Sequence, residues 1–296
     1  MKLFVNDLTV MDFSYLCPKR GMVGESWIVD IVLDGGLNEE SMVQDFGKVK
    51  KELKHIIDEY VDHKLVVPAE NQGVVITHDA SHERVQVDFT YQHKTDSEQK
   101  SMHLYCPPEA YAFVYAEEVN MDSVTEYLKE VIKVHLPENV HSVAISLREE
   151  VILTDFYHYT HGLKKHDGNC QRIAHGHRSK VLIFEDGEES QKWQSYWSER
   201  WADIYVGTEE DLVAPSDLSF SHSNINEEQF YCFKYEASQG VFELAIEKSA
   251  SEIIQTDSTV ECLAQYMFDE LKTKTDKRLE VRAFEGVGKG AIVADD

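Results

Sequence analysis

The predicted elements of this 296-residue chain occur in the same order twice, and this repetition constrains the fold more than any other feature. In the first half, apolar and alternating runs predict strands over 2–16, 25–33 and 142–147. Apolar residues at three- and four-residue steps predict one helix from Asp45, and Asp122 is a suitable N-cap for a second. The first half therefore reads as two strands, two helices and a closing strand.

The second half starts this order again at residue 151. Strands are predicted over 151–161 and 173–184, and a helix over 189–202. A last helix opens at Asp257, and closing strands follow it near the end of the chain. Two such units in one chain indicate an internal duplication.

Each half also contains a strand-rich insertion, at residues 73–118 and 206–248. With 296 residues, the chain is long enough for two domains of ordinary size. We therefore predict an α+β fold with one domain at 1–150 and a second at 151–296.

A group of histidines lies at the first hairpin of the second half. On an extended strand, alternate side chains share a face, so His175 and His177 should project together. His161 ends the preceding strand, and a hairpin would bring its imidazole beside them. Three histidines with a fourth position open are typical of catalytic zinc, although a lone His-Gly-His segment is more often two surface histidines. Cys170 lies in the intervening loop, close enough to act on whatever the metal holds.

Residues 157–177 resemble the zinc signature of the 6-pyruvoyl-tetrahydropterin synthase and 6-carboxytetrahydropterin synthase family. That signature is an aromatic strand ending in histidine, a loop with a cysteine, and His-Gly-His. The resemblance implies the T-fold, in which antiparallel sheets from several domains join into a barrel with helices outside. It also implies Zn²⁺ at His161, His175 and His177, and a homo-oligomer, because open sheet edges tend to pair.

The two halves match this family unequally. In the first half, Asp12 stands where we place His161, and Val23-Gly24-Glu25 stands where the His-Gly-His lies, which makes a poor zinc site. The family's catalytic Asp-His pair matches Asp62 and His63, whereas the second half offers Ile204 at the place of that histidine. The resemblance therefore implies one site, divided between the halves, with Cys170, Asp62 and His63 as catalytic residues.

The substrate contacts that the resemblance implies lie near the end of the chain. Glu285 matches the family's pterin-binding glutamate, whose first-half counterpart is Glu149 or Glu150. A carboxylate suits this role because it accepts two parallel hydrogen bonds. Thr259 belongs to a helix-opening segment similar to the family's Pro-Thr-Ser-Glu.

The family's substrate is 7,8-dihydroneopterin triphosphate, and its members give one of two products. Loss of triphosphate with internal redox gives 6-pyruvoyl-tetrahydropterin, and loss of the side chain gives 6-carboxytetrahydropterin, on the route to queuosine-type nucleosides. The short interval between Cys170 and His175 is similar to the second branch. A non-catalytic pterin- or metal-binding paralogue is the alternative from a different class.

Composition limits the partners. The formal charge of -25 argues against nucleic acid and anionic membranes, so an anionic substrate needs a local positive patch. The densest basic cluster near the histidines consists of Lys164, Lys165, Arg178 and Lys180. The five scattered cysteines and the early polar residues predict a cytoplasmic protein with reduced thiols and no membrane segment.

Overall fold

A computed structural model of the chain describes residues 1–93, 98–220 and 224–295, and each repeat forms its own sheet. In the first sheet, β1 and β2 make a long antiparallel hairpin beside which the other strands align in the order β7-β3-β1-β2-β8. The strands are β1 (Lys2–Cys17), β2 (Gly21–Gly35), β3 (Leu65–Pro68), β7 (Tyr111–Val114) and β8 (Val140–Glu149).

Two helices, α1 (Phe46–Tyr60) and α2 (Met121–Lys133), pack with this sheet in the first core. The apolar stripe of α1 is buried as its spacing predicts. Asp45 caps α1, because its side chain accepts a hydrogen bond from the Lys48 amide at 3.0 Å. Asp122 is not the cap of α2: Asn120 takes that position and forms a capping box with Ser123.

The second sheet has the same central hairpin, made by β9 (Phe156–His161) and β10 (His175–Glu185). Residues 151–155 precede β9 without being part of a strand. The strand order is β16-β12-β9-β10-β17-β18, with β11 paired to β10. The further strands are β11 (Glu188–Glu189), β12 (Ala202–Thr208), β16 (Ser251–Ile254), β17 (Leu279–Phe284) and β18 (Gly290–Ala294).

Helices α3 (Gln191–Arg200) and α4 (Val260–Lys272) pack with this second sheet. The tryptophans on and just after α3 lie in its core with Tyr157 and Tyr159, so these rings serve packing. Helix α3 has 10 residues and α1 has 15, so the second repeat has the shorter helix, as its sequence indicates.

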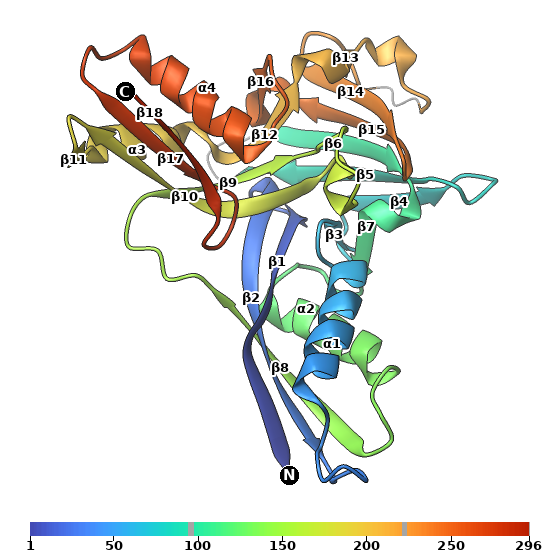
Figure 1. Ribbon diagram of the computed structural model, residues 1–296. Helices are drawn as coiled ribbons and strands as arrows, with labels where there is room; N and C mark the ends of the chain where they lie inside the picture. The colour runs from blue at the N-terminus through green and yellow to red at the C-terminus, as the bar shows by residue number, and fades with distance from the viewer. Residues whose placement is uncertain (94–97, 221–223, 296) are drawn as a thin grey trace.

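The two insertions form a third sheet together, with the strand order β13-β14-β15-β6-β5-β4 (Figure 1). Strand β6 of the first insertion pairs with β15 of the second, and Leu104 lies opposite Leu244. This sheet therefore fastens the two repeats to each other. Its strands are β4 (Val74–His78), β5 (Val85–Gln92), β6 (Gln99–Cys106), β13 (Leu212–Val213), β14 (Phe230–Ala237) and β15 (Gly240–Glu247).

The prediction of antiparallel sheets closing into a barrel is only partly correct. The sheets of the two repeats are mixed, since β3 runs parallel to β1 and β12 runs parallel to β9, whereas the third sheet is antiparallel throughout. Both strands return after a helix, and such a crossover leads naturally to parallel pairing. Among residues 1–93, 98–220 and 224–295 the sheets curl without closing. In the same ranges, no helix is long and apolar enough to cross a membrane.

The hairpins of the two repeats cross face to face, as Figure 1 shows for β1/β2 and β9/β10. Gly24 pairs with Ser14, and Gly176 pairs with Thr160, so these positions are equivalent in the two repeats. The Ser14 and Thr160 hydroxyls meet at 2.7 Å. A Cβ atom on Gly24 would lie 1.9 Å from the Tyr159 carbonyl oxygen, so both glycines serve close approach of the two backbones.

Candidate active site

The three predicted metal ligands meet at one point. His161 ends β9 and pairs with His175, the first residue of β10, while His177 projects from the same face of β10. All three are almost fully buried, and their ring nitrogens lie within 4.8 Å of one another. The Nε2 atoms of His161 and His177 are 3.2 Å apart, and Nε2 of His175 is buried without a hydrogen-bond partner. Three ring nitrogens therefore face one small volume.

The other ring nitrogen of each histidine has an acceptor nearby. Nδ1 of His161 contacts the Ser258 carbonyl oxygen at 2.9 Å, and Nδ1 of His175 contacts the Arg172 carbonyl oxygen at 3.0 Å. These contacts place the proton on Nδ1 and leave Nε2 free to bind a metal. Burial lowers the pKa of both His161 and His175 well below the usual range, so each is neutral, as a ligand must be. The donors present fit a metal ion.

The Asp-His pair of the first repeat lies beside this cluster in the same chain. His63, Cys170 and His175 also have ligand atoms within 4.8 Å of one another. Nδ1 of His63 is 2.7 Å from the Asp62 carboxylate, which leaves its other nitrogen for the thiol. Burial lowers the pKa of His63, but Asp62 and Cys170 outweigh burial and raise the pKa to about 10. A protonated His63 suits proton donation better than metal binding.

A strained turn presents His63. Its φ of 54° lies in the left-handed region, which costs a non-glycine residue on the order of 1 kcal/mol. Two hydrogen bonds to Asp12 hold the turn: the His63 amide donates to the Asp12 carbonyl oxygen at 2.7 Å, and the Asp12 amide donates to the Asp62 carboxylate at 2.7 Å. Strand β1 thus fixes the Asp62-His63 pair that follows α1.

The loop that carries Cys170 is held by the second insertion. The Gln239 amide donates to the side-chain oxygen of Gln171 at 2.7 Å, and the Tyr235 hydroxyl donates to the Gln171 carbonyl oxygen at 2.7 Å. Gln239 also donates to Asn169 at 2.8 Å. Residues 206–248 therefore position the thiol, a role that the strand pattern of this insertion does not reveal.

Glu285 lies at the edge of the histidine cluster. Its Oε1 is 4.0 Å from Nε2 of His177, its Oε2 is 3.7 Å from Nζ of Lys289, and its side chain is 22% exposed. A carboxylate that is close to the ligands and open to solvent can accept hydrogen bonds from a bound molecule. The next residue, Gly286, lies against Asp12 with a φ of 67° that favours glycine.

Thr259 has a structural role in the chain. It is the N-cap of α4, and its hydroxyl accepts from the Cys262 amide at 3.4 Å. Its neighbour Ser258 contacts His161, as stated above. Thr259 also lines a small cavity of about 130 Å³ beside Leu163 and His166.

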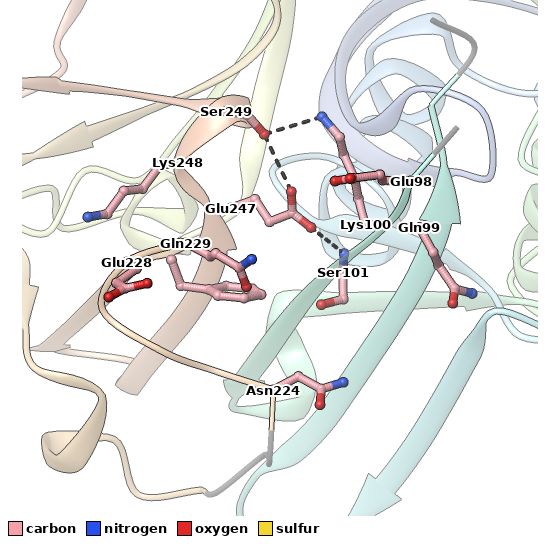
Figure 2. Close-up of a pocket in the computed structure, with 11 residues that line it drawn as sticks. Glu98, Gln99, Lys100, Ser101, Asn224, Glu228, Gln229, Glu247, Lys248 and Ser249 are labelled. Atoms are coloured by element: carbon pink, nitrogen blue, oxygen red, sulfur yellow. Dashed lines mark hydrogen bonds between the residues drawn. The ribbon is translucent and has the colours of Figure 1, made fainter. Parts of the chain in front are cut away.

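A larger cavity of about 510 Å³ lies away from the histidines, at the third sheet (Figure 2).

The position of Asp12 differs from the one predicted from the sequence, which matches it to His161. Strand register makes Tyr15 the counterpart of His161, and Asp12 the counterpart of His158. Asp12 is therefore not a decayed ligand: its Oδ1 lies 3.2 Å from Nδ1 of His177, and its Oδ2 lies 3.2 Å from Nζ of Lys289. Burial raises the pKa of Asp12, but the interactions with His177, Lys289 and the Ser26 hydroxyl outweigh burial and hold the pKa well below its usual range. The one usable signal was an acidic residue inside an apolar strand.

The equivalent site of the first repeat is filled by ion pairs. Asp203, with φ 57°, is the counterpart of His63, which corrects the assignment of Ile204 to that place. Arg20 makes two hydrogen bonds to Asp203, the longer at 2.8 Å. Register also selects Glu149 as the counterpart of Glu285. Among the residues that the structure places, this side has no histidine triad.

Both halves of the chain are similar to one known protein family. The family model described as 6-pyruvoyl tetrahydropterin synthase matches residues 17–149 and again 150–295. No curated protein matches the chain. Similar solved structures include a Plasmodium vivax 6-pyruvoyltetrahydropterin synthase altered at a catalytic residue, with 12% identity and a TM-score of 0.38, covering 50% of this chain and 90% of that one.

A Plasmodium falciparum 6-pyruvoyl tetrahydropterin synthase is also similar, with 12% identity, a TM-score of 0.37 and the same coverage of 50% and 90%. The two matches to the family model lie side by side and together span nearly the whole chain. The chain therefore belongs to the 6-pyruvoyl tetrahydropterin synthase family, as a tandem duplication.

Proposed function

We propose that this chain is a zinc-dependent lyase that acts on 7,8-dihydroneopterin triphosphate and forms 6-carboxytetrahydropterin. The observation that carries the proposal is the convergence of three histidine Nε2 atoms beside Cys170 and His63. Membership of the family supports pterin chemistry. The proposal places the zinc site in domain 151–296 and the Asp-His pair in domain 1–150, so that the two complete one site.

His161, His175 and His177 would hold the zinc through Nε2, with Asp12 and two backbone carbonyls holding their Nδ1 atoms. When bound, zinc supplies Lewis acidity to the substrate's side-chain hydroxyls, which makes the protons beside them easier to remove. Glu285 would receive the amino group and ring N–H of the pterin.

Cys170 is the base in this proposal, and His63 is its proton partner. An imidazolium next to a thiol stabilises the thiolate, which is the form able to take a proton from carbon. His63, held by Asp62, would then donate its proton to the oxygen that gains charge. Expulsion of triphosphate follows, and hydrolytic cleavage by one water molecule then releases the two outer side-chain carbons as acetaldehyde and leaves the inner carbon as the carboxyl group.

Incubation of the purified protein with 7,8-dihydroneopterin triphosphate tests this function. Released triphosphate and a 6-carboxytetrahydropterin mass support it, whereas a 6-pyruvoyl-tetrahydropterin mass reassigns the product. No turnover with zinc bound would favour the alternative of a non-catalytic binding protein.

Substitution of a second cysteine, far from the histidines in sequence, provides a matched control for the role of Cys170. Cys170→Ala should abolish turnover and keep the metal, and Cys17→Ala should retain turnover, since Cys17 is equally half-buried but lies away from the histidines at the end of β1. Loss of metal from Cys170→Ala would make the thiol a fourth ligand and the site structural.

A further inference from the structure

Two nearly buried cations lie beside the candidate site without a carboxylate at ion-pair distance, although Glu109 acts on both of them from farther away. Lys64, directly after His63, is 8% exposed, and Arg172, two residues after Cys170, is 5% exposed. Neither makes an ion pair with any residue in the ranges that the structure describes. Buried lysine and arginine are normally paired directly, so two cations that Glu109 offsets only from a distance can accept a further anion.

The existing contacts of Arg172 leave part of its guanidinium free. Nε donates to the Gln239 side chain at 3.0 Å, and Nη1 reaches the Asp62 carbonyl oxygen at 3.5 Å. The first contact comes from the second insertion and the other from the catalytic turn, so Arg172 is fixed in place. The ammonium of Lys64 has no hydrogen-bond partner among the described residues, and it is not one of their fully buried unpaired atoms. It therefore reaches solvent.

The two cations also act on each other. Burial lowers the pKa of Lys64 to about 8, and Arg172 contributes to that lowering. Burial likewise lowers the pKa of Arg172 to about 10. Like charges held together in a half-buried place are destabilising, and a bound anion removes that cost.

The basic cluster predicted to receive the anion, Lys164, Lys165, Arg178 and Lys180, already has hydrogen-bond partners in the structure. Lys164 bonds to Asp211 at 2.8 Å, and Lys165 bonds to Asp257 at 3.0 Å. Arg178 and Lys180 are likewise engaged, by the Glu150 carbonyl oxygen at 2.9 Å and the Glu150 carboxylate at 2.8 Å. Four neutralised cations attract an anion weakly in a chain with a net charge of -25.

We propose that Lys64 and Arg172 bind the phosphate chain of the substrate, with Arg172 as a planar donor and Lys64 as a mobile charge. This inference rests on the proposed function for the identity of the substrate. Lys64 directly follows His63, and Arg172 lies two residues after Cys170. A phosphate chain bound by these two cations would therefore lie close to the side-chain carbon from which Cys170 removes a proton. Charge-assisted hydrogen bonds of this kind suit phosphate oxygens.

The direct test is calorimetric titration of the zinc-loaded protein with inorganic tripolyphosphate, supplied as its magnesium salt to spare the zinc. Lys64→Met and Arg172→Met should each weaken binding about 10- to 100-fold, and Lys64→Arg should restore most of it. Lys54→Met, which removes a lysine from the surface of α1, is the control and should bind as the wild type does. Zinc content and melting temperature, measured for each variant, show whether the fold and the metal are intact.

A kinetic comparison separates this inference from the proposed function. Lys64→Met should raise the KM for 7,8-dihydroneopterin triphosphate about 10- to 100-fold, and should leave the Kd for unphosphorylated 7,8-dihydroneopterin unchanged. If Lys64→Met is active with unchanged KM and unchanged tripolyphosphate affinity, the phosphate site is overturned and the proposed function is not. The same holds if tripolyphosphate affinity falls only in Lys165→Met. Tripolyphosphate binding that needs Lys64 and Arg172, without any turnover, would uphold the site and overturn the lyase.

Discussion

The Asp12 carboxylate of the first repeat lies 3.2 Å from Nδ1 of His177 in the second. A partner of this kind fixes the orientation of a metal-binding histidine and makes its Nε2 a better donor. The same residue holds the turn of Asp62 and His63 through its backbone. Asp12 therefore links the metal cluster to the acid–base pair.

Asp12→Asn should lower zinc affinity about 10- to 100-fold, because an amide is a weaker acceptor for the imidazole N–H. The backbone bonds to Asp62 and His63 are retained, so the turn stays in place. Competition with a fluorescent zinc chelator measures the change. Asp30→Asn, which removes a surface carboxylate from the same hairpin, should bind zinc normally. Equal affinity in wild type and Asp12→Asn would exclude this role.

His63→Ala should reduce kcat roughly 10²- to 10⁴-fold, the usual effect of losing a general acid–base group. Its zinc content should match the wild type, because the three predicted ligands remain. Asp203→Asn alters the equivalent turn of the other repeat and should leave kcat within a few-fold. Steady-state kinetics with metal analysis checks both, and a fully active His63→Ala protein would remove His63 from the mechanism.

Glu25 makes stability depend on pH. Burial, with Glu149 nearby, raises its pKa from 4.5 to about 8, although Arg178 and Arg20 oppose the rise. The folded protein then keeps a proton that the unfolded chain has released, so stability falls as pH rises from 4.5 to 8. Burial lowers the pKa of neighbouring His158 from 6.5 to about 4, which gives the opposite slope below pH 6.5.

Between pH 6.5 and 8, where His158 no longer contributes, Glu25 should add a slope of up to about 1.4 kcal/mol per pH unit to the slope of the same sign from His63, whose folded pKa is about 10. Glu25→Gln should flatten that slope and raise the stability at pH 8. Urea unfolding at several pH values measures it, with Glu59→Gln on an exposed part of α1 as the control. An unchanged slope would show that Glu25 is ionised in the folded protein.

Gly24→Ala should destabilise the fold by roughly 2 kcal/mol or more, because overpacking forces backbones apart. The added Cβ would lie 1.9 Å from the Tyr159 carbonyl oxygen and 2.7 Å from the His177 amide nitrogen. Gly36→Ala meets nothing within 4 Å and should change stability little. Thermal unfolding compares the two variants, and equal melting temperatures would mean that the repeats do not cross here.

Much of this fold follows from the sequence, because the two hairpins and helices α1 and α2 carry clear local periodicity. The sheet shared by the insertions does not, since the pairing of Leu104 with Leu244 joins residues 140 positions apart. No local pattern encodes such a partner. The closed barrel expected from the family is likewise not formed within the described part of this chain.

The candidate site, like the fold, could be predicted from the sequence only in part. The histidine triad follows from alternation on β10 and from the hairpin, so a short motif was sufficient. Asp12, Lys64 and Arg172 acquire their roles only through contacts between the repeats, and the sequence analysis misplaced Asp12 by matching it to His161. Tyr15, three positions from Asp12, pairs as His161 does, and a shift by an odd number of residues moves a side chain to the other face of the strand. The register is visible only in the paired strands.

The central claim is that one chain builds one complete site from two unequal repeats. Co-expression of Cys170→Ala and His63→Ala chains with different tags tests it most directly, with isolation of mixed assemblies and assay of their turnover. Because His63 and Cys170 meet within one chain, the mixed assemblies should stay as inactive as either variant alone, and each chain should hold one zinc ion. Recovery of a substantial part of the wild-type activity would contradict the account, since it would show that His63 serves the cysteine of a different chain.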